Sequence, residues 1–327
     1  MDEEEIPLYN PFDKTSDRKG VKLDYSAIVK NSEIDLGEVI KHPPIAISIG
    51  EKPYKGIYYP VPFGSYGDFS CLVGASKSGK TFLKSAIEAA YLGGNSANYI
   101  SCIVGASKSK KTFYKSAIMA GYIGGNSINY FSNIKGHNNR QKWIIDIDTE
   151  QSKFHSQRTF RRVQEMTGIN NPYYRCFYLR EYSPPERIKF IEWLLNGSEY
   201  SGNIGLVSID GYADLVTDFN NIDQASDLSG KLMKWSSEQN CHITGVLHRN
   251  FGTQKPVGHV GSFILKKAET VVFIESDADT GFVNVKCEYS RNRPFEDINF
   301  DIDENALPYS IADPVKKIVK GLPKPAF

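Results

Sequence analysis

The chain has 327 residues, of which 40% are hydrophobic and 24% are charged, and its formal net charge is +1 at pH 7. This is the composition of a globular protein with enough chain to bury a core, and it excludes a strong overall attraction to nucleic acid, so that any such binding must come from local patches. The five cysteines form no CxxC pair, no apolar run approaches the roughly 18 residues of a membrane span, and the acidic start is unlike a signal peptide. We therefore expect a reduced, cytoplasmic protein with no membrane partner.

Residues 1–60 carry no chemical motif. An acidic head, Met1 to Glu5, precedes a proline-rich stretch with prolines at 43, 44, 53 and 60. This pattern predicts an extended N-terminal arm with a short helix over 32–40, which packs on its own domain or on a neighbouring subunit. Residues 62–68 then read as a turn that delivers the chain into the first buried strand.

A complete phosphate-binding motif, GxxxxGK[ST], follows at residues 74–81. The apolar run 69–73 predicts a buried strand before it, and residues 81–90 predict a helix after it. Glycines at both ends let backbone N–H groups turn toward a phosphate, and the helix N-terminus adds partial positive charge. Lys80 would reach the β- and γ-phosphates, and the Thr81 hydroxyl would hold Mg²⁺. The candidate nucleotide-binding residues are Gly74, Ser76, Lys77, Ser78, Gly79, Lys80 and Thr81.

The same unit then occurs a second time. Residues 70–100 and 101–131 align without a gap, with 23 of 31 positions identical. This indicates a tandem duplication of one strand-loop-helix unit, in which Lys110 replaces Gly79. A side chain at this position disfavours a positive φ, which argues that the first copy binds the nucleotide. The chain order argues for the second copy, because that copy leads directly into the next strand. Lys111 and Thr112 thus remain the alternative to Lys80 and Thr81.

A buried strand over 142–148 ends in acidic residues, the position where open α/β sheets place ligand chemistry. Glu150 is either the base that orients water on the γ-phosphate or an acid that caps the next helix. That helix carries arginines at 158, 161 and 162, which form either a solvated face or a contact for phosphate or an acidic partner.

Further strands are predicted over 173–182, 204–210, 242–248, 270–275 and 282–289, with a helix over 186–195. The strand 204–210 ends in Asp210, which has the form of a Walker B aspartate that holds Mg²⁺ directly or through water. His248, at the end of another strand, is either a γ-phosphate sensor or a structural histidine. The loop 249–259 is polar and glycine-rich, and residues 313–327 form a basic C-terminal tail.

The order of these pieces resembles the RecA-type ATPase core over residues 61 to 305. It is most similar to the plasmid RepA-type and DnaB-type hexameric helicases and to related ATPases of phages and mobile elements. The resemblance implies that Glu150 is the catalytic glutamate, His248 the γ-phosphate sensor, and Arg291 or Arg293 a finger that reaches a neighbouring subunit's nucleotide. It also implies that the loops after Asp210 and His248 face a central channel.

In such a channel, Arg249 and Lys255 would contact DNA phosphates. The sequence departs from this family in its duplicated phosphate loop, and it shows no primase, primase-binding or zinc domain.

These patterns together predict an α/β, RecA-like P-loop NTPase with a mostly parallel central sheet flanked by helices. We expect a RecA-like ATPase domain at 61–312 between the arm and the tail. The predicted function is that of a helicase-like ATPase of DNA replication, which uses ATP and Mg²⁺ and acts on single-stranded DNA. We expect it to be a homo-oligomer, for which a hexameric ring is one arrangement. The alternatives are a recombination or maintenance ATPase that does not unwind DNA, and a degenerate nucleotide-binding switch.

Overall fold

The computed structural model describes residues 25–34, 39–93, 133–138, 141–167, 171–249, 258–277 and 281–311. The chain divides into two units, residues 1–42 and residues 43–327. The first contains one described helix, α1 (Tyr25–Ser32). The short helix predicted over 32–40 is not present at residues 33, 34, 39 and 40, which have no regular structure, and residues 35–38 of it lie outside the described part.

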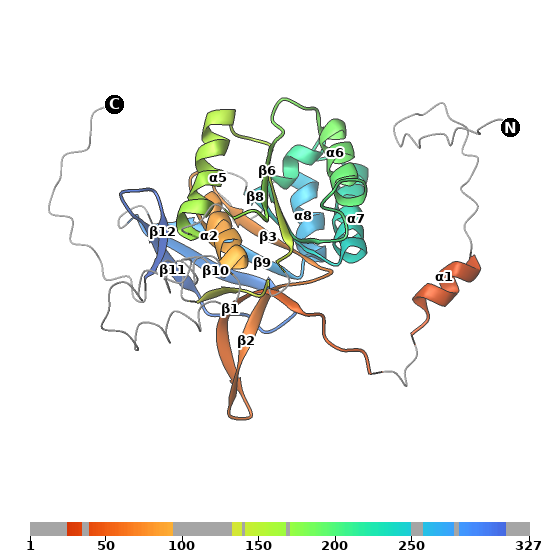
Figure 1. Cartoon of the computed structure of the whole chain (residues 1–327), viewed down its shortest axis with the longest axis horizontal. Helices are drawn as coiled ribbons and strands as arrows, with labels where there is room; N and C mark the ends of the chain where they lie inside the picture. Colours follow the sequence, from red (N-terminus) through yellow and green to blue (C-terminus); the bar gives the residue numbers. More distant parts are fainter. Residues whose placement is uncertain are drawn as a thin grey trace. The chain divides into compact units, whose positions relative to one another are not determined.

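The second unit is built around a nine-stranded sheet (Figure 1) with the order β12-β11-β10-β9-β3-β8-β7-β5-β6. The six strands from β9 to β6 are parallel, and β10, β11 and β12 continue the sheet antiparallel at one edge. The strands are β3 (Phe69–Gly74), β5 (Trp143–Asp148), β6 (Tyr174–Tyr178), β7 (Ile204–Asp210), β8 (His242–His248), β9 (Thr270–Ser276), β10 (Val283–Ser290), β11 (Ile298–Ile302) and β12 (Pro308–Ile311).

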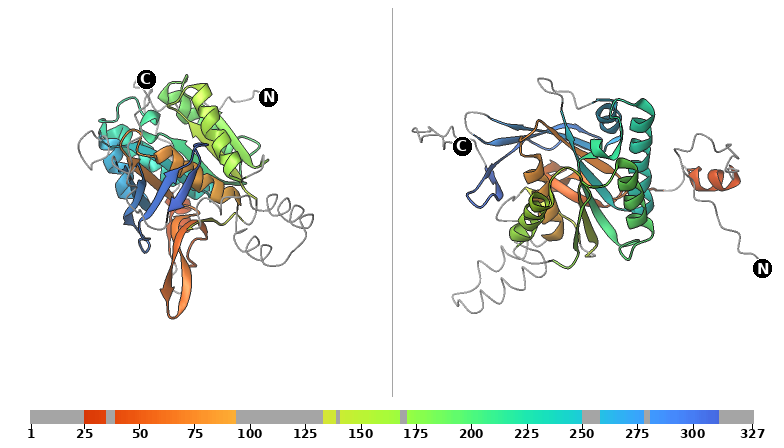
Figure 2. Two further views of the ribbon diagram at one scale, coloured as in Figure 1. Left: turned by 90° about the vertical axis from the view of Figure 1, so that its left-hand side faces the viewer. Right: turned by 90° about the horizontal axis from the view of Figure 1, so that it is seen from above.

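Helices cover both faces of this sheet (Figures 1 and 2). One face carries α2 (Lys80–Gly93) and α5 (Lys153–Thr167), and the other carries α6 (Pro184–Asn196), α7 (Ile222–Gln239) and α8 (Gly258–Lys267), with a short 3-10 helix, η2 (Tyr212–Leu215), after β7. Two apolar cores result. Along the fully buried β3, Leu72 belongs to the core under α2, whereas Cys71 and Val73 belong to the core under α7, as expected for a strand that is buried on both faces.

This arrangement confirms the predicted fold class, an α/β protein with a large, mostly parallel sheet flanked by helices. The strands predicted from apolar runs are present, although β6 is shorter than the predicted 173–182. The strand of the first repeat copy, β3, lies in the interior of the sheet between β8 and β9. The second copy lies outside the described residues.

A second, antiparallel sheet was not predicted. It consists of β2 (Ile57–Ser65), β1 (Ile45–Tyr54) and β4 (Ile134–Gly136), in that order. The turn predicted over 62–68 is wrong in its first half, because residues 62–65 belong to β2. Pro60 and Pro62 lie in β2, an edge strand of this sheet, where a missing N–H is tolerated. Pro53 lies in the central strand β1, but β4 pairs with β1 only at residues 47–49, so Pro53 faces no pairing with a described residue on that side.

In the described part of the chain, no helix is both long and apolar enough to cross a membrane.

A buried charge cluster fixes α2 against β5. The Lys84 Nζ atom donates to Asp146 Oδ1 at 2.6 Å and lies 3.1 Å from Glu88 Oε1. The Tyr174 hydroxyl donates to the other Asp146 oxygen at 2.6 Å. All three charged side chains are essentially inaccessible to solvent. Because one ammonium faces two carboxyl groups, the cluster balances its charge only if one carboxyl group carries a proton.

The protonated group is Glu88. Asp146 accepts two short hydrogen bonds, from Lys84 and Tyr174, whereas the Lys84 ammonium lies farther from Glu88, at 3.1 Å, and hydrogen bonds from Ser208 and Lys84 contribute less to Glu88 than its burial does. Burial, followed by the charge of Asp146, raises the pKa of Glu88 to about 8, and Lys84 acts in the opposite direction. We therefore expect Glu88 to carry a proton at neutral pH, next to the charged ammonium of Lys84.

Removal of the Lys84 ammonium should destabilise the protein strongly. The substitution Lys84→Met keeps much of the volume but leaves Asp146 without its cation, so we expect a loss of about 3 to 5 kcal/mol in the free energy of unfolding. Lys234→Met is the control, because Lys234 is 69% exposed on α7. Denaturant unfolding measures both; equal values for the two variants would contradict the assignment of Lys84 as the central cation.

Glu88 should make stability depend on pH. The native state holds a proton on Glu88 up to about pH 8, whereas the unfolded carboxyl group, with its ordinary value of 4.5, has already lost it. The free energy of unfolding should therefore fall as the pH rises between these two values. Glu88→Gln, which is neutral at every pH, should lack this component. Urea unfolding of both proteins across this range tests it, and parallel pH profiles would refute it.

Candidate functional site

The first phosphate-loop motif lies between β3 and α2, at the carboxyl end of the parallel strands. Gly74, at the end of β3, pairs with His248 of β8 on one side and with Ile274 of β9 on the other. The loop is therefore flanked by the ends of two strands, and the N-terminus of α2 starts at Lys80. Such a helix N-terminus favours an anion.

The two glycines of the motif are required by geometry. Gly79 has a φ of +92°, and a Cβ atom added there would lie 2.9 Å from a Val283 methyl group. A Cβ on Gly74 would lie 2.6 Å from the Ile274 carbonyl oxygen. A lysine at the Gly79 position, as Lys110 in the second copy, would be strained in this conformation. Lys110, Lys111 and Thr112 themselves lie outside the described residues.

Lys80 folds over the loop that it follows. Its Nζ atom donates to the carbonyl oxygens of Gly74 at 2.9 Å and Ala75 at 2.5 Å. Burial lowers the pKa of Lys80, although Asp210 and Glu150 favour its charged form. The ammonium is therefore held at the mouth of the loop, where its donors can turn to an anion.

Three oxygen-bearing side chains meet beside the loop. Asp148 and Asp210 are directly opposite each other at the ends of β5 and β7, and the Thr81 hydroxyl donates to Asp210 Oδ2 at 3.3 Å. Burial raises the pKa of Asp210 to about 6. The negative charges of Asp148, Glu150 and Asp146 act in the same direction, and the positive charge of Lys84 acts in the opposite direction. An incoming cation would relieve this repulsion.

Asp148 was not among the residues predicted for the site. Its Oδ1 atom accepts hydrogen bonds from the backbone N–H groups of Glu150 and Gln151 at 3.0 and 2.9 Å, and its buried Oδ2 atom has no hydrogen-bond partner among the described residues. The signal that could have found it is its place as the last residue of a strand predicted to end in acids.

The donor set fits Mg²⁺ carried with a nucleotide. No group of three or more His, Cys, Asp or Glu side chains that could hold a metal occurs among the described residues. Mg²⁺ bound with substrate phosphates needs only one or two protein oxygens, and waters complete its octahedron. The Thr81 hydroxyl and the Asp210 carboxylate supply such oxygens, with the unpartnered Asp148 oxygen close by.

Glu150 and His248 face each other across the site. The His248 Nε2 atom lies 3.2 Å from Glu150 Oε2, and both side chains are partly exposed. The hydrogen bond from His248 is the main cause that lowers the pKa of Glu150, with Lys80 and Arg180 adding to it. Glu150 is therefore ionised at neutral pH and oriented by its partner.

The phosphate loop, Asp210, Glu150 and His248 line one pocket of about 400 Å³, and Asp148 is not among its lining residues. Arg249, just beyond β8, is not one of the lining residues; it forms an ion pair with Glu275 at 2.5 Å, and its charge acts on Lys80. The residues that line the pocket are Ser76, Lys77, Ser78, Gly79, Lys80, Thr81, Phe82, Glu150, Gln151, Asp210, His248, Ser276, Gly281, Val283 and Ile302.

The predicted arginine fingers lie elsewhere. Ser290, which precedes Arg291, pairs with Thr270 at the start of β9, the opposite end of that strand from the phosphate loop. Arg291 donates to the Lys267 carbonyl oxygen at 2.7 Å, and the Arg293 guanidinium lies 5.2 Å from the centre of the Tyr54 ring. Neither arginine lines the pocket of its own chain.

Comparisons with known proteins identify no family. No protein-family model matches the chain, and no curated protein matches it. The solved structure of the RadB recombinase is similar over 76% of this chain and 93% of its own, with 14% sequence identity and a TM-score of 0.46. At this identity and TM-score, the match assigns no activity to the chain.

Replacement of Asp210 by asparagine should stabilise the metal-free protein. The native pKa of Asp210 is about 6, above its ordinary value of 3.8, so the free energy of unfolding falls as the pH rises between these values. Asp210→Asn keeps an acceptor for Thr81 without the charge, and we expect a gain of about 2 kcal/mol at neutral pH that vanishes near pH 4. Thermal unfolding with a chelator present measures it; a loss of stability at neutral pH would contradict the repulsion described here.

Proposed function

We propose that this protein is an ATPase that hydrolyses ATP in the pocket between β3 and α2. The observation that carries the proposal is the convergence of the phosphate loop, Asp210 and the Glu150–His248 pair in a single pocket. A glycine-bounded loop binds polyphosphate, a strand-end aspartate and a threonine hydroxyl hold Mg²⁺, and an oriented carboxylate positions water. The chain supplies each of these parts at strand ends that lie next to one another in the sheet.

Each side chain then has a defined task in hydrolysis. Lys80 would leave the carbonyl oxygens of its own loop for the β- and γ-phosphates, and Mg²⁺, held through Thr81 and Asp210, would neutralise charge on the phosphates. Glu150 would orient a water for attack on the γ-phosphorus, and His248 would hold Glu150 in position. The water oxygen forms the new bond to phosphorus, the bond to the ADP oxygen breaks, and the water proton leaves toward Glu150 or solvent.

We assign nucleotide binding to the first copy of the repeat. Its strand lies in the interior of the sheet, and the positive φ of Gly79 is available to glycine but not readily to lysine. Lys80 and Thr81, rather than Lys111 and Thr112, are the residues we expect to contact the nucleotide. The same geometry argues against a degenerate site in this copy.

Completion of the site by an arginine would require a second subunit. Arg291 and Arg293 lie at the far end of β9 and β10 from this chain's own pocket. A homo-oligomer, such as a hexameric ring, could place one of them against the γ-phosphate of a neighbour, where it would stabilise charge in the transition state.

We propose single-stranded DNA as the substrate on which this ATPase acts. One surface supports it: the hairpin of β1 and β2 exposes Tyr54, Tyr58 and Tyr59 beside Lys55, whose Nζ atom lies 5.5 Å from the centre of the Tyr54 ring. Residues 52–67 contain no acidic side chain. Exposed aromatic rings among cations suit stacked bases and phosphates. A helicase and a recombination or maintenance ATPase share these features, and strand displacement on forked DNA separates them.

The test is ATP turnover with and without single-stranded DNA on wild type, Lys80→Ala and Lys111→Ala. We expect DNA-stimulated turnover that Lys80→Ala lowers at least about a hundredfold, as expected when charge stabilisation of the transferring phosphoryl group is lost, and that Lys111→Ala leaves near the wild-type rate. Loss of turnover only in Lys111→Ala would reassign the site to the second copy, and absence of turnover in wild type would refute the ATPase proposal.

A further inference from the structure

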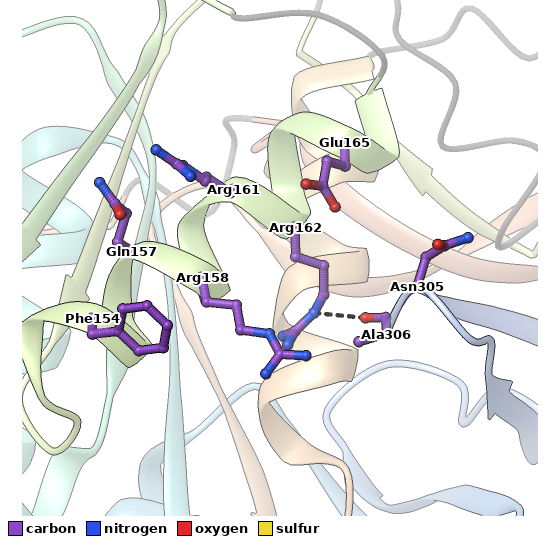
Figure 3. Close-up of a pocket in the computed structure, with 8 residues that line it drawn as sticks. All are labelled: Phe154, Gln157, Arg158, Arg161, Arg162, Glu165, Asn305 and Ala306. Carbon is purple, nitrogen blue, oxygen red and sulfur yellow. Dashed lines mark hydrogen bonds between the residues drawn. The ribbon is translucent and has the colours of Figure 1, made fainter.

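A second cavity, of about 230 Å³, lies beside α5 and is lined by three arginines (Figure 3). Arg158, Arg161 and Arg162 come from α5, and the turn between β11 and β12 closes the other side. The guanidinium groups of Arg158 and Arg162 overlap in the view of Figure 3, and the charge of Arg158 acts on Arg162, whereas the Arg161 side chain is directed away from them. The remaining lining residues are Phe154, Gln157, Glu165, Asn305 and Ala306.

Arg162 is a buried cation that forms no ion pair within 4 Å with a carboxylate of the described residues. Its side chain is only 8% exposed, and its two hydrogen bonds go to neutral acceptors, the Ala306 carbonyl oxygen at 3.0 Å and the Ser85 hydroxyl at 3.3 Å. Burial, followed by the charge of Arg158, lowers the pKa of Arg162 to about 10, although Glu88 and Glu165 favour its charged form. A buried charge without a directly paired opposite charge is costly, and an anion in the cavity would offset that cost.

The other charges around the cavity leave it positive. Arg158 and Arg161 are exposed, and neither forms a hydrogen bond or an ion pair with any residue that the structure describes. Glu165 is the single carboxylate in the lining; its charge acts on Arg162, but it forms no ion pair within 4 Å with any of the three arginines. Three cations and one anion leave an excess of two positive charges around a space several times the roughly 30 Å³ that a water molecule occupies in the liquid.

We propose that this cavity is a second phosphate-binding site, separate from the phosphate loop. The guanidinium fork matches phosphate oxygens in pairs, and neighbouring arginines are stable together when they share one anion. The amide groups of Gln157 and Asn305 add neutral donors. Phe154, which is 71% exposed at the rim, offers a ring on which a base attached to the phosphate can stack. The ligand class is thus a nucleotide phosphate, either free or part of a single strand.

The two phosphate sites share a wall. The Arg162 guanidinium lies 4.0 Å from the centre of the Phe82 ring, and Phe82 also lines the pocket beside the phosphate loop. Ser85, which accepts a hydrogen bond from Arg162, donates to the Thr81 carbonyl oxygen at 3.0 Å. An anion that draws Arg162 toward the cavity therefore acts on the first turn of α2, which carries Lys80 and Thr81.

The test uses the full-length chain in a Lys80→Ala background, which weakens phosphate binding at the loop. Isothermal titration measures the affinity for pyrophosphate and for a short oligothymidylate, with Arg158→Gln or Arg161→Gln added singly. Both arginines are exposed, so these changes leave the core intact. Lys234→Gln, which removes one exposed charge from α7, is the matched control.

We expect Arg158→Gln to lower the affinity for at least one of these two ligands about tenfold or more, which is the loss expected for a charged hydrogen bond. The control should change neither affinity. Weaker pyrophosphate binding would assign a free phosphate ligand, and weaker oligothymidylate binding alone would assign a single strand. Equal affinities in the arginine variants and the control, or no binding of either probe to the parent protein, would overturn the proposal. ATP turnover of the Arg158→Gln variant with Lys80 intact tests the proposed ATPase activity of the phosphate loop separately from binding at the second site.

Discussion

The ammonium of Lys84 is the charge on which the arrangement of the proposed nucleotide pocket depends. It lies one turn beyond Lys80 and Thr81 on α2 and binds Asp146, two residues before the end of β5. This bond sets the distance between the helix that carries the phosphate loop and the strand that leads to Asp148 and Glu150. Because both partners are buried, water cannot replace either, and the helix cannot shift without exposing a charge to the apolar core. The buried charge cluster around Lys84 therefore determines the geometry of the site as well as contributing to the stability of the fold.

The parts of the fold that the sequence predicted are those with strong local signals. Buried parallel strands such as β3, β7 and β8 are continuous apolar runs, and the phosphate loop is defined by its glycines. The hairpin of β1 and β2 was missed because its prolines suggest irregular chain, and their tolerance depends on an edge position that only the sheet order reveals. The antiparallel strands β11 and β12 were missed for a related reason, since they are short and only partly buried.

Much of the site could also be anticipated, because strand-end residues meet wherever parallel strands are neighbours. Asp210, Glu150 and His248 each end or follow a strand, and the sheet order brings them to one pocket. The charge states could not be anticipated. The raised pKa of Asp210 and the lowered pKa of Glu150 depend on burial and on partners far apart in sequence, such as Lys84 and His248. The cavity beside α5 shows the same limit, since three arginines on one helix do not reveal which of them is buried.

The opposite placement of the pocket and of Arg291 and Arg293 has a consequence for assembly. A site that takes its arginine from a neighbour joins unlike faces of two subunits, so the contact is head-to-tail and has a direction. In an open row of subunits, the last pocket has no arginine donor, whereas in a closed ring every pocket has one. Specific activity in a row would therefore rise with its length, because the inactive end becomes a smaller share of the whole. Ring closure would remove that dependence and make every subunit equivalent.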